Sequence, residues 1–520
     1  MLDLLWGIGG MIVIIAIALL FSVDRRRIRF RTVALALALQ VGFGVLVLYV
    51  PAGRVALETV TRGVQAVINA SGAGIDFLFG PVLPEEGSVF AFQVLPVIVF
   101  FAALTSVLYH LGVLQWVVKI IGGGLAKLLG TSTPESMNAA ANIFVGQTEA
   151  PLVIRPYVAA MSRSELFAVM CGGLATVAGS VLVGYSLLGA PLEYLIAASF
   201  MAAPAALLMA KLLVPSGALE DAPAPADGAD DDAARPAPGT DGPAQEDPER
   251  TGRRGVRQWL AGGARRGATS YAALELTHRP DAPAAERTDA GRGAAGSPAA
   301  RPGDAAGAAG TDRPGDAGGT AGTGAPDHAT RTPGGEPVPA TGAAGEDDEP
   351  ANVIDAAARG ASDGLSLALN VGAMLIAFIS LIALVNVVLG AVGGLFGLEA
   401  LTLEQLFGYV FAPVMFAVGV PWAEALDAGS FLGQKLVLNE FVAFADFAPQ
   451  IEDYSPKTQA IVTFALTGFA NFGSLAILLG GLGGIAPGRR ADIARLGLLS
   501  VLGGTLANLM SATIAGMLIG

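Results

Sequence analysis

Eight mostly apolar stretches, each long enough to cross a lipid bilayer as a helix, are the feature that most constrains this chain. They lie at 4–22, 33–50, 93–111, 166–188, 192–214, 365–389, 459–482 and 496–518. The hydrocarbon core of a bilayer needs about 20 apolar residues of helix. We therefore predict an all-α integral membrane protein with eight transmembrane helices in the cell (cytoplasmic) membrane.

Composition agrees with a membrane protein. Only 14% of the 520 residues are charged and 53% are hydrophobic, whereas soluble domains carry about 25% charge. Residues 216–350 alone hold 23 acidic residues, 13 Arg and no Lys, which leaves −3 of the total net charge of −13 for the rest. A single cysteine, Cys171, cannot form an intrachain disulfide. These proportions argue against a soluble enzyme, a secreted disulfide-linked domain and a nucleic-acid-binding protein.

Arginine-rich loops predict the orientation. The loop 24–31 holds five Arg and the turn 487–495 holds three. Such loops face the cytoplasm, and eight spans place both on that side, with both termini outside. The connections 51–91 and 400–457 are then expected as external loops. Residues 216–350, rich in Ala, Gly, Pro and Asp, bury too little apolar surface to fold and are expected to form a long disordered cytoplasmic insert.

Two further apolar stretches, 141–157 and 431–444, carry polar groups that a lipid-facing helix does not tolerate. The first includes Glu149 and the second includes Glu440. A charge at bilayer depth is costly unless it has partners, so both carboxylates point to function. Non-helical backbone at that depth must be buried in protein or line a wet cavity. Because both stretches are short, we expect two re-entrant helical hairpins.

Each hairpin is followed by a span with a polar break. The first break surrounds Thr176 within 172–181, and the second surrounds Asn471 within 467–474. Hairpin, broken span and span therefore occur twice, entering from opposite sides. This order predicts an inverted repeat with a binding site where the breaks meet. Close helix packing accounts equally well for the glycines at the breaks, but not for the carboxylates.

The side chains near the breaks indicate a small polar ligand with hydroxyl groups. Three residues of the first hairpin offer donors and acceptors suited to the edge of a polar ring such as a nucleobase: Gln147, Thr148 and Glu149. Three residues of the second half suit sugar hydroxyls, because a carboxylate makes strong charge-assisted hydrogen bonds: Glu440, Asn471 and Ser474. Phe469 adds an apolar wall beside Asn471.

A coupling cation would find a separate set of oxygen atoms. Asn142 supplies a side-chain oxygen and Thr176 a hydroxyl, and the backbone carbonyls of Val145 and Val177 become free where helices break. Neutral oxygen ligands suit a weakly held monovalent ion. Glu149 would favour a cation nearby, or could itself carry a proton.

Six motifs, in the right order, resemble the concentrative nucleoside transporter family. They are Gly146–Pro151, Ser164–Met170, Ala175–Ser180, Leu438–Phe441, Gly468–Phe472 and Ala512–Gly516. The resemblance covers about 1–215 and 351–520. The insert has no counterpart in the family's usual short connection.

The resemblance implies secondary active nucleoside uptake, driven by a sodium or proton gradient, by a homotrimer in the lipid bilayer. It places the nucleobase against the first hairpin tip and Val181, and the ribose against Glu440, Asn471 and Ser474, with Phe469 adjacent. It places sodium at Asn142, Val145, Thr176 and Val177. An elevator-like movement of a transport domain against a trimeric scaffold is the mechanism that it suggests.

This scheme divides the chain into five parts. Scaffold helices occupy 1–111 and 351–400, the two halves of the transport domain occupy 112–215 and 401–520, and the insert occupies 216–350. The polar set at Asn142 and Thr176 favours sodium over protons, which remain the alternative. A membrane-embedded hydrolase and a passive channel are further alternatives. No histidine accompanies the two carboxylates, which weighs against hydrolysis.

Overall fold

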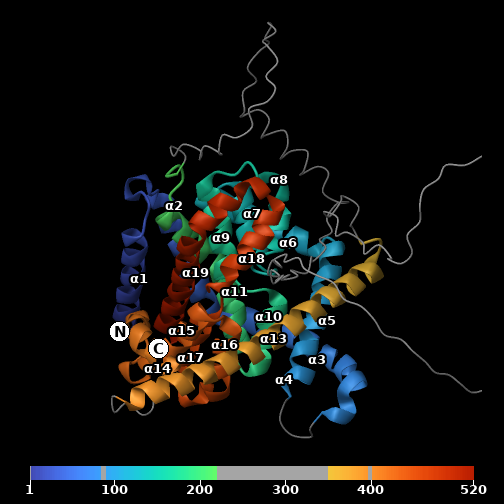
Figure 1. Cartoon of the computed structure of the whole chain (residues 1–520). Helices are drawn as coiled ribbons and strands as arrows, with labels where there is room; N and C mark the ends of the chain where they lie inside the picture. Colours follow the sequence, from blue (N-terminus) through green and yellow to red (C-terminus); the bar gives the residue numbers. More distant parts are fainter. Residues whose placement is uncertain (1, 84–88, 220–349, 396–400, 520) are drawn as a thin grey trace, which may run out of the picture. The chain divides into compact units, whose positions relative to one another are not determined.

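The computed structural model describes residues 2–83, 89–219, 350–395 and 401–519, and all regular secondary structure in them is helical (Figure 1). The prediction of an all-helical membrane protein is confirmed. Most of the predicted insert, 220–349, lies outside the described residues.

Seven segments of the described chain are long and apolar enough to cross a membrane. They are formed by α1 (Leu2–Leu20), α2 (Phe30–Gly44) with the π-helical turn η2 (Val45–Tyr49), α4 (Phe90–Gln93) with α5 (Leu95–His110), α9 (Arg163–Ala175) with α10 (Gly179–Leu188), α11 (Leu192–Leu213), α13 (Val353–Gly394) and α19 (Arg490–Ile519). The predicted span 459–482 is not a continuous helix. It is divided between α17 (Pro456–Leu466) and α18 (Gly473–Ile485), because the chain leaves the helix at the polar break.

The two segments that we predicted as hairpins, and call hairpins below, are longer than predicted. The first consists of α7 (Thr133–Ala141), a non-helical stretch, η4 (Ala150–Ile154) and α8 (Arg155–Val158). The second consists of α15 (Trp422–Val437), α16 (Glu440–Phe447) and η5 (Ala448–Asp453). The first helix of each segment begins before the predicted residues 141 and 431, because residues that favour the start of a helix lie further upstream. Pro134 and Glu135 open α7 after Ser132, and Pro421 precedes α15.

Two connections that we expected to be external loops are largely helical. An amphipathic helix, α3 (Pro51–Phe79), fills most of 51–91, and α14 (Leu403–Val418) precedes the second hairpin and is bent from α15 by 116°. The loop expectation was wrong because it weighed the charges of these stretches and not their helical spacing. The remaining elements are α6 (Val113–Leu129), η1 (Arg25–Arg27), η3 (Gly80–Val82) and η6 (Pro487–Arg489).

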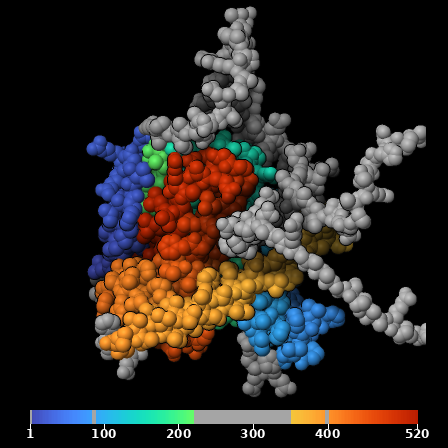
Figure 2. Space-filling model, in the orientation of Figure 1, coloured from blue at the N-terminus to red at the C-terminus, as the bar shows by residue number. Residues whose placement is uncertain are grey.

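Helix α19 lies at the centre of the packing. It contacts α1, α9, α11 and α17 (Figure 1), and its residues from Val501 to Gly516 are almost all buried. By contrast, most of the apolar side chains of α13 are open on the face shown in Figure 2, where the helix is yellow to orange. The interior of the described chain is therefore built from the two broken helices together with the continuous helices α11 and α19.

Helix α13 packs on α5 through two small residues. A Cβ atom at Gly360 would lie 2.6 Å from the Ser106 Cβ, and one at Gly364 would lie 2.7 Å from the Ala102 Cβ. The Ser106 hydroxyl also donates to the Ala356 carbonyl at 2.8 Å. This spacing of small residues allows two membrane helices to approach closely.

Candidate functional site

The two helix breaks meet directly. Helix α9 ends at Ala175 and α10 begins at Gly179, whereas α17 ends at Leu466 and α18 begins at Gly473. Between them, the Phe469 backbone N–H donates to the Thr176 carbonyl at 3.1 Å. The hydrogen bond joins residues almost 300 positions apart and brings the two predicted breaks into one site.

Each break is also bonded to the hairpin that precedes it. The Gly179 N–H donates to the Phe144 carbonyl at 3.1 Å in the first half, and the Phe472 N–H donates to the Leu436 carbonyl at 3.1 Å in the second. The same kind of contact therefore recurs in both halves of the chain. These bonds satisfy backbone groups that a break would otherwise leave exposed in an apolar interior.

Glu440 is the centre of the second half of the site. It opens α16 and is only 5% exposed. Its carboxylate accepts from the Tyr185 hydroxyl at 2.9 Å and from the Asn471 Nδ2 at 3.0 Å. The Asn471 Oδ1 in turn accepts from the Ser474 N–H at 2.8 Å. The structure thus joins three predicted residues in one hydrogen-bonded chain.

Tyr185 was not predicted. It is fully buried in α10, and its ring stacks on Phe444 with the ring centroids 4.4 Å apart. The available signal was its position one helical turn after Val181, which is itself buried in the first turn of α10. The side chains at these two positions share one face of the helix.

The tip of the first hairpin holds polar atoms without partners among the described residues. The Gln147 Nε2 donates to the Ser474 Oγ at 3.4 Å, but the Gln147 Oε1 has no hydrogen-bond partner. The Thr148 hydroxyl donates to the Glu149 Oε1 at 2.9 Å, and the Glu149 Oε2 is buried and unpaired. Buried polar groups are normally satisfied, so these two oxygens call for a ligand, an ion, a proton or water.

The predicted cation residues lie at the first break and are buried. Asn142 donates from Nδ2 to the Asn138 carbonyl at 3.0 Å, whereas its Oδ1 has no hydrogen-bond partner. The Thr176 hydroxyl donates to the Gly172 carbonyl at 2.8 Å, which leaves the hydroxyl oxygen free to act as an acceptor. Val145 and Val177 are also buried. Neutral oxygen atoms of this kind suit a monovalent cation.

A cavity of about 150 Å³ reaches Glu149 from the side of α5 and α13. Its polar lining includes Thr105, Glu149, Ser180, Asp363 and Asn370. Ligand pockets usually measure about 300–1,000 Å³. This cavity is too small for a nucleoside, and Glu440 does not line it, so it is a polar opening beside the first hairpin and not the whole site.

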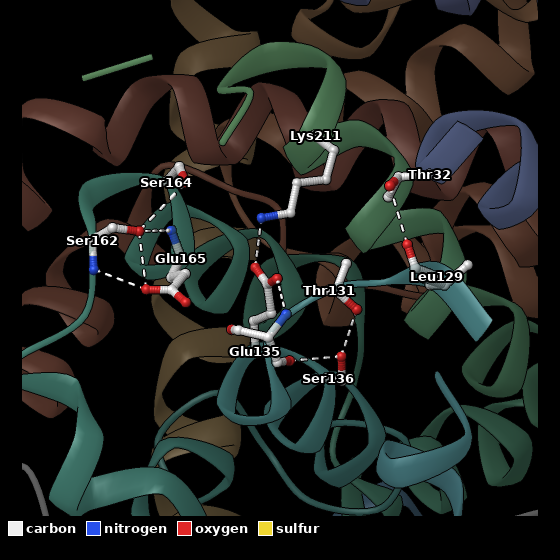
Figure 3. Close-up of polar contacts among 10 residues, drawn as sticks. Thr32, Leu129, Thr131, Glu135, Ser136, Ser162, Ser164, Glu165 and Lys211 are labelled. Carbon is white, nitrogen blue, oxygen red and sulfur yellow. Dashed lines mark hydrogen bonds and ion pairs between the residues drawn. The ribbon is translucent and has the colours of Figure 1, made fainter. Parts of the chain in front are cut away.

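A second polar cavity, of about 280 Å³, lies at the start of the first hairpin (Figure 3). The Lys211 ammonium forms a buried ion pair with Glu135 at 2.6 Å. The Ser132 N–H donates to Glu135 at 2.7 Å, and the Ser162 N–H donates to Glu165 at 2.9 Å. The two glutamates therefore cap α7 and α9, and the cavity's charged groups serve to fix helix ends.

Family models match most of the chain. A model described as the N-terminus of Na+ dependent nucleoside transporters matches residues 9–82, and one described as their C-terminus matches residues 325–516. A model described as nucleoside recognition matches residues 91–192, which contain the first hairpin and the first break.

Whole-length relatives agree with these matches. The chain is 46% identical over 519 residues to an uncharacterized transporter, YutK, of Bacillus subtilis, with 100% of each chain covered. It is 39% identical over 528 residues to the nucleoside permease NupC of Helicobacter pylori, covering 99% of this chain and 98% of that one. A solved structure of CNTnw in an inward-facing substrate-bound state has 42% identity and a TM-score of 0.73, covering 99% of this chain and 98% of the other. The chain therefore belongs to the concentrative nucleoside transporter family, whose members are nucleoside transporters and not enzymes.

Proposed function

We propose that the protein is a sodium–nucleoside symporter of the cell membrane. The observation that carries the proposal is a pair of glutamates: Glu440, buried at the second break, and Glu149, half-buried in the first hairpin segment with a buried Oε2. Glu440 is held by Tyr185 and Asn471, and Glu149 has an unpaired oxygen beside the residues proposed for the cation. A buried carboxylate needs partners, and a cation together with a hydroxyl-rich solute supplies them.

The nucleoside is proposed to lie between the two halves. Glu440, Asn471 and Ser474 would hold the ribose, because each carboxylate oxygen retains a second acceptor site after its hydrogen bond to the protein. Gln147, with its unpaired oxygen, would meet the nucleobase together with Thr148, Glu149 and Val181. Phe469 lies in the second break. A substrate lacking a hydroxyl would leave Glu440 underpaired and is expected to be rejected.

Sodium is proposed to bind at Asn142, Val145, Thr176 and Val177. The buried, unpaired Asn142 Oδ1 supports this assignment, and the family models that match are described as Na+ dependent. Proton coupling is the second candidate, favoured by the unpaired Glu149 Oε2, which protonation would convert into a donor.

Alternating access by an elevator movement of a homotrimer is part of the proposal. The exposed apolar length of α13 supports it, since such a helix must face lipid or a neighbouring subunit. The orientation with both termini outside and residues 216–350 in the cytoplasm is likewise proposed from the arginine-rich loops.

Replacement of sodium tests the coupling ion. Proteoliposomes containing the purified protein should accumulate labelled uridine in a sodium gradient and lose that accumulation when choline replaces sodium at fixed pH. Recovery of unaltered uridine inside the vesicles checks that the solute is transported and not hydrolysed. Undiminished accumulation without sodium, abolished instead by collapsing a proton gradient, would favour the proton-coupled alternative.

A further inference from the structure

Lys435 is a fully buried lysine in the second hairpin. Its side chain is 0% exposed. The ammonium donates to the Ala465 carbonyl at 2.6 Å and to the Asn508 Oδ1 at 2.8 Å. Among the described residues its hydrogen-bond partners are therefore neutral oxygens, which is also the ligand type expected around a bound sodium ion. A buried ammonium is costly to desolvate, so a residue of this kind requires an explanation.

Asn508 of α19 extends this contact to both helix breaks. Its Nδ2 donates to the Ala175 carbonyl at 2.7 Å and to the Thr467 carbonyl at 2.8 Å. Ala175 ends α9, and Thr467 directly follows the last residue of α17. The last carbonyls of a helix lack intrahelical partners and carry partial negative charge. Lys435 and Asn508 thus neutralise and join the carboxyl ends of both broken helices.

The hydrogen bonds between hairpin and break, which occur in both halves, allow the position of Lys435 to be compared with the first half. Phe144 accepts from the first break and Leu436 accepts from the second, so the two residues correspond. Lys435 directly precedes Leu436, and the proposed sodium ligands Asn142 and Val145 lie two residues before and one residue after Phe144. In each half, a position beside the hairpin turn therefore faces the broken helix. The first half presents oxygen ligands there, and the second presents an ammonium group.

We propose that Lys435 is a tethered cation, which does at the second break what the coupling ion does at the first. The ammonium holds the end of α17 and, through Asn508, the end of α9, so that the ribose-binding residues Glu440 and Asn471 are positioned without a second dissolved ion. This inference rests on the proposed sodium site. Lys435 is a positioning residue, because it acts through the helix ends and not by touching the nucleoside.

Two substitutions separate this role from packing. Lys435→Ala opens a space for a small cation beside the Ala465 carbonyl and the Asn508 Oδ1, whereas Lys435→Met fills that space with an uncharged chain. Both variants should lose uridine uptake about tenfold to a hundredfold, because buried acceptors lose their donor. Added methylammonium should restore uptake in Lys435→Ala and not in Lys435→Met. Lys127→Ala, at an exposed lysine of α6, is the control that should stay at the wild-type level with or without methylammonium.

The outcomes are decisive in both directions. Wild-type uptake by Lys435→Met, or a folded Lys435→Ala variant that no small cation restores, would overturn the proposal. If neither variant is stable in detergent, the number of sodium ions taken up with each uridine by the wild-type protein decides, measured with labelled sodium and labelled uridine in the same proteoliposomes. About one sodium ion per uridine is expected, and about two would overturn the proposal. Uptake that ignores sodium would refute the proposed sodium coupling and, with it, the comparison of Lys435 with a sodium ion. Methylammonium rescue would still show whether the positive charge at Lys435 is needed for uptake.

Discussion

At the scale of single residues, the surroundings of Glu440 show how a carboxylate is kept at bilayer depth. Sequence spacing predicted that Glu440, Asn471 and Ser474 act together, and the structure links them by hydrogen bonds. The contact of Tyr185 with Glu440 was not predicted: its position one turn after Val181 places it on the same helix face, but it reaches Glu440 only through the packing of α10 against α16. Lys435 was visible as a charge in the second hairpin, but its partner Asn508 lies on a helix with no sequence signal for this contact.

Replacing Glu440 with Gln tests the ribose assignment. The amide keeps the volume but loses the charge-assisted acceptors, so uridine uptake should fall by at least about tenfold while the amount of folded protein stays the same. Tyr185→Phe, which removes one hydrogen bond and keeps the charge, should cause a smaller loss. Near-normal uptake by Glu440→Gln, measured at equal protein content in proteoliposomes, would contradict the role assigned to Glu440.

At the scale of elements, the sequence predicted where helices break better than where they begin. The breaks near Thr176 and Asn471 follow from glycines and polar residues within apolar runs, and both are present. The starts of α7 and α15 were missed because an apolar scan ignores the capping residues that open a helix. The helix α3 was missed because its apolar positions recur at helical spacing without forming a continuous run. Helix α14 was missed although 406–418 is a continuous apolar run, because the stretch was assigned to an external connection.

The contact between α13 and α5 gives a prediction at this scale. Gly364→Leu should push the helices apart, since even a Cβ atom would lie 2.8 Å from the Val99 Cα, and overpacking of this kind costs about 1–3 kcal/mol. The thermal unfolding temperature of the purified protein in detergent should fall. Gly390→Leu, on the same helix but with nothing within 4 Å of its Cβ position, is the matched control. Equal unfolding temperatures for the two variants would show that the close approach is unimportant.

At the scale of the whole molecule, the order of elements could be predicted because a predicted hairpin, a broken helix and a further helix follow one another in both halves of the chain. Hydrophobic length alone identified seven of the eight predicted spans, and the eighth is interrupted at the predicted polar break. The division into scaffold and transport domains, the trimer and the orientation stay predictions. They depend on contacts between subunits and with lipid, which a single chain does not encode in local patterns.

The insert gives a prediction for the whole chain. Replacing residues 220–349 with a flexible linker should leave sodium-dependent uridine uptake within about twofold of wild type, because a segment of this composition is not expected to add to a packed core. Gly217 is retained because its carbonyl accepts from Arg27, and Asn352 because it caps α13. A deletion variant that reaches the membrane and unfolds at the wild-type temperature could still fail to transport uridine. That result would show that the insert has a regulatory function.

The hydrogen bond from Phe469 to Thr176 has a thermodynamic consequence for the two ligands. It ties one non-helical segment to the other. If the ion and the nucleoside bind where we propose, a change of shape at one segment would alter the affinity of the other. Linkage then demands symmetry: whatever factor an ion at the first segment contributes to solute affinity, the solute must return to the ion. In the proposed scheme, this one backbone amide would link the affinity for the ion to the affinity for the nucleoside.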